Sequence, residues 1–288
     1  MALIIIIVIL LALAIFLLAP SPGRRRAEDW RGTMFAHRGL HGAGAAENTL
    51  EAFERACRVG FGIELDVQLS RDGAVVVFHD DALARMTGDA RRVEQVDLAG
   101  LRALSLKGKG RIPTFEEVLK RVDGRVPLLV EIKNGRHNRR LCEETLRLLR
   151  GYRGRYLVES FNPLILRWLR KNAPEVVRGQ LVGAPACYLG AHFGRAGAFL
   201  LSSLALNFLA RPDFVAYDVA AVHFSAPRIQ RALFHTPLAA WTVRDSDVLS
   251  RCLSQGEMAI FEAFEPEHAG GRSKEAPEHA DPGKAAHG

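Results

Sequence analysis

Residues 62–79 read Gly62-Ile-Glu-Leu-Asp-Val-Gln-Leu-Ser-Arg-Asp-Gly-Ala-Val-Val-Val-Phe-His79, and this stretch constrains the fold more than any other. It contains two β-rich runs, residues 62–66 and 74–78. Residues 70–73 are too few for the crossover that joins parallel strands, so the two runs must form an antiparallel hairpin. Asp72-Gly73 is a favoured two-residue hairpin turn. We therefore predict that Asp66 lies opposite His79.

The predicted hairpin gathers polar side chains on one face. Cross-strand partners share a face of a sheet, with Cβ atoms about 5 Å apart. Side chains along a strand alternate with a period of two, so Glu64 lies on the same face as Asp66. We expect two carboxylates and the imidazole of His79 to meet at the end of one strand.

The rest of the chain alternates β-rich runs with helical patterns. The eight runs are residues 34–37, 62–66, 128–132, 156–160, 177–181, 214–218, 238–242 and 258–261. Eight strands with helices between most of them predict an α/β fold, the (β/α)8 or TIM barrel. Thr114 and Glu117 form a capping-box pattern before a helix. Residues 82–110 predict a long loop or a small insertion above the barrel.

Residues 1–19 are apolar and carry no charged side chain. About 20 such residues span a bilayer, so this run predicts a transmembrane anchor. A cleaved signal peptide is one alternative, although no basic residue precedes the run. A buried core helix is another, and it would lack any polar face. The three arginines at positions 24–26 follow the run, and the positive-inside tendency would place the catalytic domain on the cytoplasmic side.

These patterns divide the chain into four segments. We expect a transmembrane anchor at residues 1–19, a basic linker at 20–32, the barrel domain at 33–264 and a polar disordered tail at 265–288. Residues 196–210 are unusually apolar and predict a helix that either packs on the barrel or dips into a membrane.

Composition excludes several classes of protein. With 288 residues, of which 48% are hydrophobic and 25% charged, the chain is long and apolar enough to bury a core. The four cysteines lie far apart and show no metal-ligand spacing, which favours reduced structural thiols. The net charge of +7 comes from scattered basic residues without interleaved aromatic residues. This pattern argues against nucleic acid and favours a phosphate-bearing ligand or a membrane surface.

Other barrel strands also end in polar residues. His37 and Arg38 follow the first strand, and Glu131 and Lys133 share a face of the third. Barrel enzymes carry their chemistry at the C-terminal ends of the strands, so we expect these residues to join the hairpin residues there. Three carboxylates without cysteine suit Mg²⁺ or Ca²⁺. Two histidines suit acid–base catalysis, and an arginine with a lysine suits a phosphate.

The sequence from residue 35 to residue 264 closely resembles the glycerophosphodiester phosphodiesterase family. The motifs that carry the resemblance are His37-Arg38-Gly39, Glu47-Asn48-Thr49, Glu64-Leu-Asp66, Asp72-Gly73, His79-Asp80, Ile112-Pro113-Thr114, Glu131-Ile-Lys133, Ser160-Phe161 and Trp241-Thr-Val243. The chain departs from the family pattern in two places. Ala46 stands where the family usually has proline, and residues 260–264, which include Glu262, replace a strand end that usually contains Thr-Asp.

The resemblance implies a TIM barrel and a divalent cation, Mg²⁺ or Ca²⁺, held by Glu64, Asp66 and Glu131. It also implies catalysis by His37 and His79 and hydrolysis of glycerophosphodiesters to glycerol 3-phosphate and an alcohol. We assign His37 as the general base and His79 as the general acid. The nucleophile is either a glycerol hydroxyl, which would give a cyclic phosphate, or a metal-bound water.

Five further residues complete the expected site. Arg38 and Lys133 would bind the phosphate, and Phe161 and Trp241 would contact the rest of the substrate, although a large aromatic residue on a barrel strand also suits packing. Glu47 would orient Arg38, or serve as an acidic residue near a helix N-terminus.

Three functions fit these residues. The first is a glycerophosphodiesterase, the second a membrane-tethered lysophospholipase D acting on lysophospholipids, and the third a catalytically silent phosphate-binding barrel. Retention of both histidines argues against the third, because a binding protein needs no acid–base pair.

Overall fold

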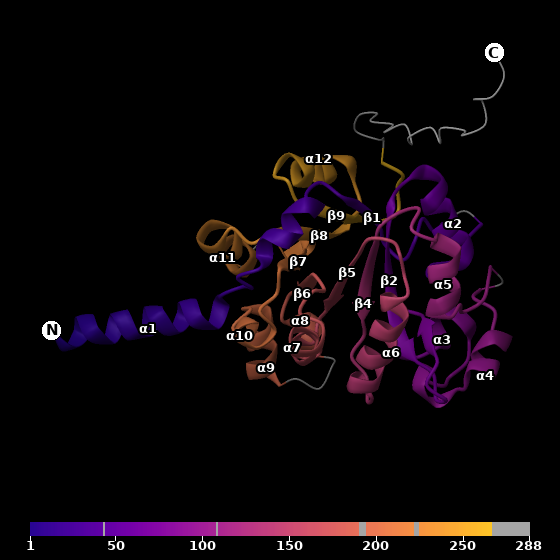
Figure 1. Cartoon of the computed structure of the whole chain (residues 1–288), viewed down its shortest axis with the longest axis horizontal. Helices are drawn as coiled ribbons and strands as arrows, with labels where there is room; N and C mark the ends of the chain where they lie inside the picture. The colour runs from indigo at the N-terminus through magenta and orange to yellow at the C-terminus, as the bar shows by residue number, and fades with distance from the viewer. Residues whose placement is uncertain (43, 108, 190–193, 222–224, 267–288) are drawn as a thin grey trace, which may run out of the picture.

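The computed structural model describes residues 1–42, 44–107, 109–189, 194–221 and 225–266. Its centre is a closed parallel barrel, as the sequence predicted (Figure 1). The barrel strands are β1 (Met34–Ala36), β2 (Gly62–Leu69), β4 (Leu128–Ile132), β5 (Tyr156–Ser160), β6 (Arg178–Val182), β7 (Phe214–Asp218), β8 (Leu238–Val243) and β9 (Met258–Phe261). Pairing of β1 with both β2 and β9 closes the sheet.

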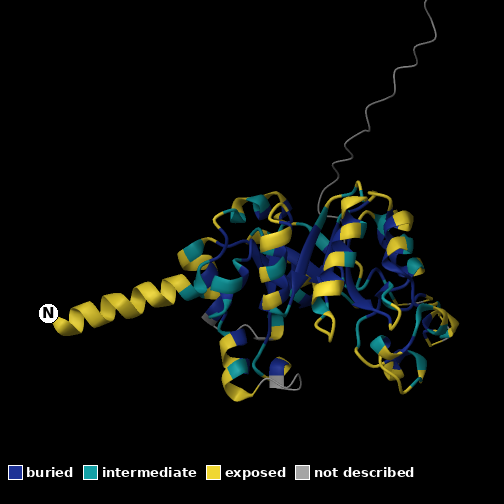
Figure 2. Cartoon of the chain, turned by 60° about the horizontal axis from the view of Figure 1, so that its bottom comes forward, coloured by how far each residue is buried: buried dark blue, intermediate teal, exposed yellow. Residues whose placement is uncertain are grey.

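Helices surround the barrel because alternate strand residues point outward. Ile63, Leu65 and Val67 of β2 are buried in the layer that also contains Phe53 and Val118 from two of these helices. The helices are α2 (Leu50–Val59), α5 (Phe115–Val122), α6 (Asn138–Arg150), α7 (Pro163–Asn172), α8 (Ala186–Leu189), α9 (Arg195–Ser202), α10 (Asn207–Ala210), η3 (Val219–Ala221), α11 (Ser225–Phe234) and α12 (Ser246–Ser254). Figure 2 shows the buried strands inside this partly exposed layer.

Local signals explain how several helices begin. The Thr114 hydroxyl accepts a hydrogen bond from the Glu117 N–H, and the Glu117 carboxylate accepts one from the Thr114 N–H. This capping box was predicted and starts α5. The Asn162 side chain caps α7, where Pro163 takes the first helical position.

The hairpin differs from its predicted register by one residue. β3 (Val75–Val77) pairs antiparallel with β2, and Val67 lies opposite Val77. The predicted register, in which Asp66 lies opposite His79, would have placed Val67 opposite Phe78. The Ser70 hydroxyl accepts the Ala74 N–H at 2.8 Å and donates to Asp72 at 2.6 Å, which closes a three-residue turn. The predicted pairing of Asp66 with His79 is therefore wrong, because a serine next to the Asp-Gly turn lengthens the loop.

Residues 82–110 form a small insertion with its own core. It contains α3 (Ala84–Thr87), η2 (Val93–Gln95) and α4 (Leu98–Ala103). Leu83, Leu101 and Leu106 are buried there together with Val76 and Phe78 of the hairpin. This small insertion rests against the hairpin strand that leads to His79.

The apolar N-terminus forms α1 (Ala2–Leu18), a 17-residue helix that projects from the barrel with its residues exposed over most of its length. Within the residues that the structure describes, no helix meets the length and hydropathy needed to cross a bilayer. The predicted transmembrane anchor is thus not found, since the helix ends at Leu18, before Ala19 and Pro20. The cytoplasmic placement of the catalytic domain stays a prediction.

The segment expected to be a linker, residues 20–32, packs against the barrel. It contains η1 (Arg24–Trp30), in which Ala27 and Trp30 are buried. Trp30 packs on Phe35, with ring centroids 6.4 Å apart. Arg26 donates to the Pro174 carbonyl at 2.7 Å and pairs with the buried Asp213 at 3.2 Å. This segment closes the N-terminal end of the barrel.

The remaining expectations concern apolar and terminal segments. Residues 196–210, expected to form one apolar helix, are divided between α9 and α10, and Phe199 and Leu200 are exposed. The four cysteines, all within the described residues, are free, as expected. Residues 267–288 of the expected disordered tail lie outside the described residues.

Candidate active site

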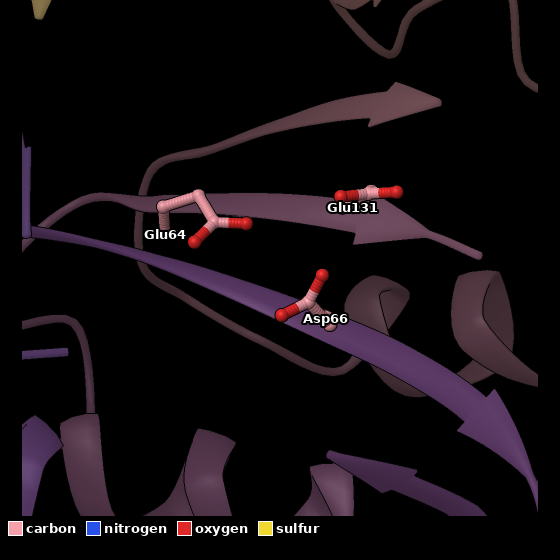
Figure 3. Close-up of side chains that lie close together, drawn as sticks. All are labelled: Glu64, Asp66 and Glu131. Carbon is pink, nitrogen blue, oxygen red and sulfur yellow. The ribbon is translucent and has the colours of Figure 1, made fainter. Parts of the chain in front are cut away.

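Three carboxylates converge at the C-terminal mouth of the barrel (Figure 3). Glu64 and Asp66 come from β2 and Glu131 from β4, and all three are buried. Asp66 and Glu131 are direct register partners in neighbouring parallel strands, so their side chains leave the sheet on the same, inner face. One oxygen from each residue lies within 4.8 Å of the other two. The predicted metal-ligand residues are therefore brought together.

Cationic and amide groups surround these carboxylates. The Lys133 ammonium lies 3.3 Å from Asp66 Oδ1 and 3.0 Å from Glu131 Oε1. The Arg38 backbone N–H donates to Glu64 at 2.9 Å, and the Asn48 amide donates to Asp66 at 2.8 Å. Arg38 and Asn48 both have positive φ, of 55° and 56°, a backbone conformation that costs energy and is common at functional sites. Arg38 and Lys133 are placed as predicted.

The charges of the three carboxyl groups differ because their neighbours differ. Burial, together with Asp66 and Glu159, raises the pKa of Glu64 well above its ordinary value. Burial also raises the pKa of Glu131, to about 7, although Lys133 opposes the shift. Burial alone would raise the pKa of Asp66, but Lys133, His79 and Arg38 hold it well below the ordinary value. Bringing a cation to this cluster would stabilise all the ionised forms.

His37 lies just after β1, between two acidic groups. Its Nδ1 is hydrogen-bonded to Glu262, which follows β9. Its Nε2 lies 3.9 Å from Glu64 Oε2 and so faces the carboxylate cluster. The other oxygen of Glu262 accepts from Arg244 Nε at 2.8 Å and from Arg244 Nη2 at 2.5 Å.

His79 has a similar set of partners. Its Nδ1 is 2.6 Å from Asp80 Oδ1, and Asp80 Oδ2 accepts a hydrogen bond from Arg85. Burial lowers the pKa of His79, while Asp66 opposes that shift. Arg85 also donates to Glu47, which accepts from Arg38, so a chain of side-chain hydrogen bonds links His79 to the barrel mouth despite the shifted register.

Gln68 holds the backbone of His79 near the barrel mouth. β3 ends at Val77, so the alternation of the strand does not decide where the His79 side chain points. The Gln68 amide donates to three successive carbonyls, those of Phe78, His79 and Asp80, at 2.8, 3.2 and 3.0 Å. This contact fixes the backbone that carries His79 at the barrel mouth.

The arginine that was expected to bind phosphate is linked to Glu47. Arg38 Nη1 donates to Glu47 at 2.8 Å, and Arg85 Nη1 donates to the other Glu47 oxygen at 3.0 Å. α2 is capped by Thr49, and Glu47 precedes its first turn. The contact expected between Glu47 and Arg38 is present, and Arg85 extends it to Asp80.

Phe161 and Trp241 lie side by side on the inner side of the barrel. Their ring centroids are 5.6 Å apart at an interplanar angle of 86°. Trp241 is on β8, which is opposite β4 in the closed order of strands. The indole N–H of Trp241 donates to no group within the described residues. Phe161 follows β5, the strand next to β4, so the two aromatic rings form an apolar wall between the β5 and β8 sides of the mouth.

Sequence reasoning missed two acidic residues of this site. Glu159 on β5 is the register partner of Glu131, is 1% exposed, and its Oε2 accepts no hydrogen bond from the described residues. Burial, with Glu131 and Asp66, raises the pKa of Glu159 well above its ordinary value. Alternation along residues 156–160 would have placed Glu159 beside Glu131. Glu262 was noted as a departure at a strand end, and only the barrel closure shows that it meets His37.

Comparison with known proteins identifies the family. A model of the glycerophosphoryl diester phosphodiesterase family matches residues 37–262. The chain belongs to this family. The match begins at His37, directly after β1, and ends at Glu262, directly after β9.

Related proteins and structures are named as phosphodiesterases or as a lysophospholipase D. A glycerophosphodiester phosphodiesterase of Caldanaerobacter subterraneus subsp. tengcongensis is 36% identical over 51% of this chain and 65% of its own length. Human lysophospholipase D GDPD1 is 32% identical over 49% of each chain. A solved Oleispira antarctica phosphodiesterase in complex with the product sn-glycerol-3-phosphate has a TM-score of 0.66 and 25% identity, over 82% of this chain and 94% of that one. This chain spans 44% to 65% of the length of the first curated relatives.

Proposed function

We propose that this protein is a divalent-metal-dependent phosphodiesterase that hydrolyses glycerophosphodiesters to glycerol 3-phosphate and an alcohol. The observation that carries the proposal is the meeting of Glu64, Asp66 and Glu131 with His37 at one barrel mouth, to which side-chain hydrogen bonds also link His79. Membership of the phosphodiesterase family supports it. A binding protein would need the cationic groups alone, whereas this site also holds a pair of acid–base groups.

The donor set fits a hard divalent cation. All the candidate ligands are carboxylate oxygens, which Mg²⁺ and Ca²⁺ prefer. With Glu159, the mouth holds four buried carboxyl groups beside the cations of Arg38 and Lys133. Glu64, Asp66 and Glu131 would hold the metal ion, which would offset the negative charge that develops on the phosphoryl group.

Other side chains of the site bind the phosphate and transfer the protons. Lys133 and Arg38 bind the phosphoryl oxygens as fixed cations, and Glu47 holds the Arg38 guanidinium in place. His37 Nε2 takes a proton from the attacking water as its oxygen bonds to phosphorus; on the route in which a glycerol hydroxyl attacks instead, water then opens the cyclic phosphate. The bond from phosphorus to the alcohol oxygen breaks, and His79 Nε2 gives that oxygen a proton. Phe161 and Trp241 exclude water from the side of the substrate that does not react.

A choline-release assay of the full chain tests this function. Glycerophosphocholine with Mg²⁺ or Ca²⁺ should release choline and glycerol 3-phosphate, and excess EDTA should abolish the release. Glu131→Gln should lose activity and metal binding, while Glu143→Gln, an exposed residue of α6 that pairs with Arg139, should keep both. Full turnover in EDTA would refute the metal-dependent mechanism.

A lysophospholipase D reaction at the same site is the second candidate. The human relative named lysophospholipase D GDPD1 favours it, and so does the apolar wall of Phe161 and Trp241. The same assay with lysophosphatidylcholine decides between the two substrates. A kcat/KM for lysophosphatidylcholine tenfold or more above that for glycerophosphocholine would establish the second candidate.

A further inference from the structure

Glu262 joins two strand ends at the point where the barrel closes. The His37 N–H donates to the Phe261 carbonyl at 2.9 Å, and the Glu262 N–H donates to the Val243 carbonyl at 3.0 Å. These backbone bonds fix Glu262 between the ends of β1 and β8. Its side chain is mostly buried, with 17% of its surface exposed.

The two oxygens of the Glu262 carboxylate have separate partners. Oε1 accepts both the Nε–H and an Nη2–H of Arg244, at 2.8 and 2.5 Å. Oε2 is hydrogen-bonded to His37 Nδ1. His41 Nε2 lies 4.0 Å from the same Oε2, which is beyond hydrogen-bonding distance. Because Arg244 donates two hydrogen bonds to Oε1, Oε2 is the oxygen left for His37.

We propose that Glu262 is the positioning residue of His37 and keeps its proton on Nδ1. An ionised carboxylate can only accept hydrogen bonds, so the imidazole nitrogen that meets it must carry the proton. The free lone pair is then on Nε2, which faces the metal-binding carboxylates. This inference rests on the proposed function, in which His37 is the general base, and it gives Glu262 a role that the active-site carboxylates do not have.

The ionised state of Glu262 agrees with this arrangement. The hydrogen bond from His37 and the cation of Arg244 lower the pKa of Glu262 to about 2. The carboxylate thus stays charged at every pH at which the enzyme is expected to work.

Replacement by glutamine gives a sharp test because Arg244 can only donate hydrogen bonds. In Glu262→Gln, the amide oxygen should remain with Arg244, and the amide NH₂ should turn toward His37 Nδ1. Nδ1 must then accept, which moves the proton to Nε2 and removes the base. We expect kcat to fall by about 10²- to 10³-fold with little change in KM, since the substrate contacts are intact.

Removing the arginine as well should restore part of the activity. In the double variant Glu262→Gln with Arg244→Ala, the amide is free to turn its oxygen toward His37. We expect at least a tenfold recovery of kcat relative to Glu262→Gln alone. A role of Glu262 in stability alone would give no recovery, because the second substitution removes the hydrogen bonds that remain between Arg244 and residue 262 and adds none. Glu262→Asp, which keeps the charge on a shorter side chain, should fall between wild type and Glu262→Gln.

The tautomer itself is measured by ¹⁵N NMR of histidine-labelled full-length protein at a pH where His37 is neutral. We expect Nδ1–H in wild type and Nε2–H in Glu262→Gln, with the signal assigned by its loss in His37→Ala. Nε2–H in wild type would overturn the proposal without any variant having to fold. Glu265→Gln, at an exposed position on the same loop, serves as the matched control and should keep wild-type kcat.

The outcomes separate this inference from the proposed function. If His37→Ala is inactive but Glu262→Gln stays within threefold of wild type, Glu262 does not position the base and the proposed function stands. If His37→Ala itself keeps near wild-type activity, the histidine mechanism fails, and the inference fails with it.

Discussion

The two histidines of the site have matching partners that come from very different parts of the chain. His79 is hydrogen-bonded to the next residue, Asp80, which Arg85 holds. His37 is hydrogen-bonded to Glu262, 225 residues away, which Arg244 holds. Each histidine thus has its Nδ1 on a carboxylate, and in the proposed mechanism its Nε2 transfers the proton. The first arrangement is local and survives small shifts of the barrel, whereas the second exists only when β1 and β9 meet.

Removing each histidine should have the largest effect. We expect His37→Ala and His79→Ala to lower kcat on glycerophosphocholine by about 10²- to 10⁴-fold while metal affinity is largely kept. A substrate with a p-nitrophenol leaving group needs little protonation as it departs, so it should rescue His79→Ala and leave His37→Ala slow. Steady-state kinetics on both substrates check this. Equal rescue of the two variants would break the assignment of base and acid.

The partner of His79 offers a sharper comparison. In Asp80→Asn, Arg85 should retain the amide oxygen and turn the NH₂ toward His79, which disfavours the protonated imidazole. We expect kcat on glycerophosphocholine to fall by about 10- to 10²-fold and to recover with the p-nitrophenyl substrate. The loss in Glu262→Gln should not recover with that substrate. If both losses respond alike to the leaving group, the two histidines do not have opposite roles.

Gln68 should matter for one histidine alone. Gln68→Ala frees the carbonyls of Phe78, His79 and Asp80, so the backbone that carries the acid loosens. We expect roughly a tenfold loss of kcat on glycerophosphocholine, mostly recovered with the p-nitrophenyl substrate. The matched control is Gln180→Ala, since the Gln180 amide also donates to backbone carbonyls inside the barrel but contacts neither histidine. An equal loss in both variants would indicate general destabilisation.

The smallest expected effect is on stability in acid. The pKa of Glu262 is about 2 in the folded protein and near 4.5 in the unfolded chain, so its ionised form stabilises the fold above pH 4.5. That contribution is lost as the pH falls through 4.5 towards 2. We expect wild type to lose about 1 kcal/mol more than Glu262→Gln over this range, after allowing for solvent screening. Urea unfolding at several pH values measures the difference.

The same comparison shows how much of the site the sequence could predict. Alternation along a strand placed Glu64 with Asp66, and Glu131 with Lys133, because those pairs depend on two residues of one strand. The barrel itself followed from eight β-rich runs with helical patterns between most of them. Residues that meet within one strand were therefore found, whereas Glu159, on the strand next to Glu131, was missed.

The errors arose where a few atoms decide the geometry. The Ser70 hydroxyl lengthened the hairpin turn by one residue, which a rule based on Asp-Gly alone does not include. His79 still reached the site because Gln68 holds it by side-chain hydrogen bonds, which strand periodicity does not describe. The role of Glu262 depends on barrel closure, and its residue type differs from the family pattern. No local signal links positions 37 and 262.

The segment formed by residues 20–32 blocks the N-terminal end of the barrel. Ala27 and Trp30 are buried against Phe35, Phe214 and Met258 at the end of the barrel remote from the carboxylates. The described residues thus close this end of the barrel, and in the proposed reaction water, substrate and both products pass through the carboxylate end. Because Lys133 and Arg38 would hold the phosphate monoester there, we expect it to leave after the alcohol.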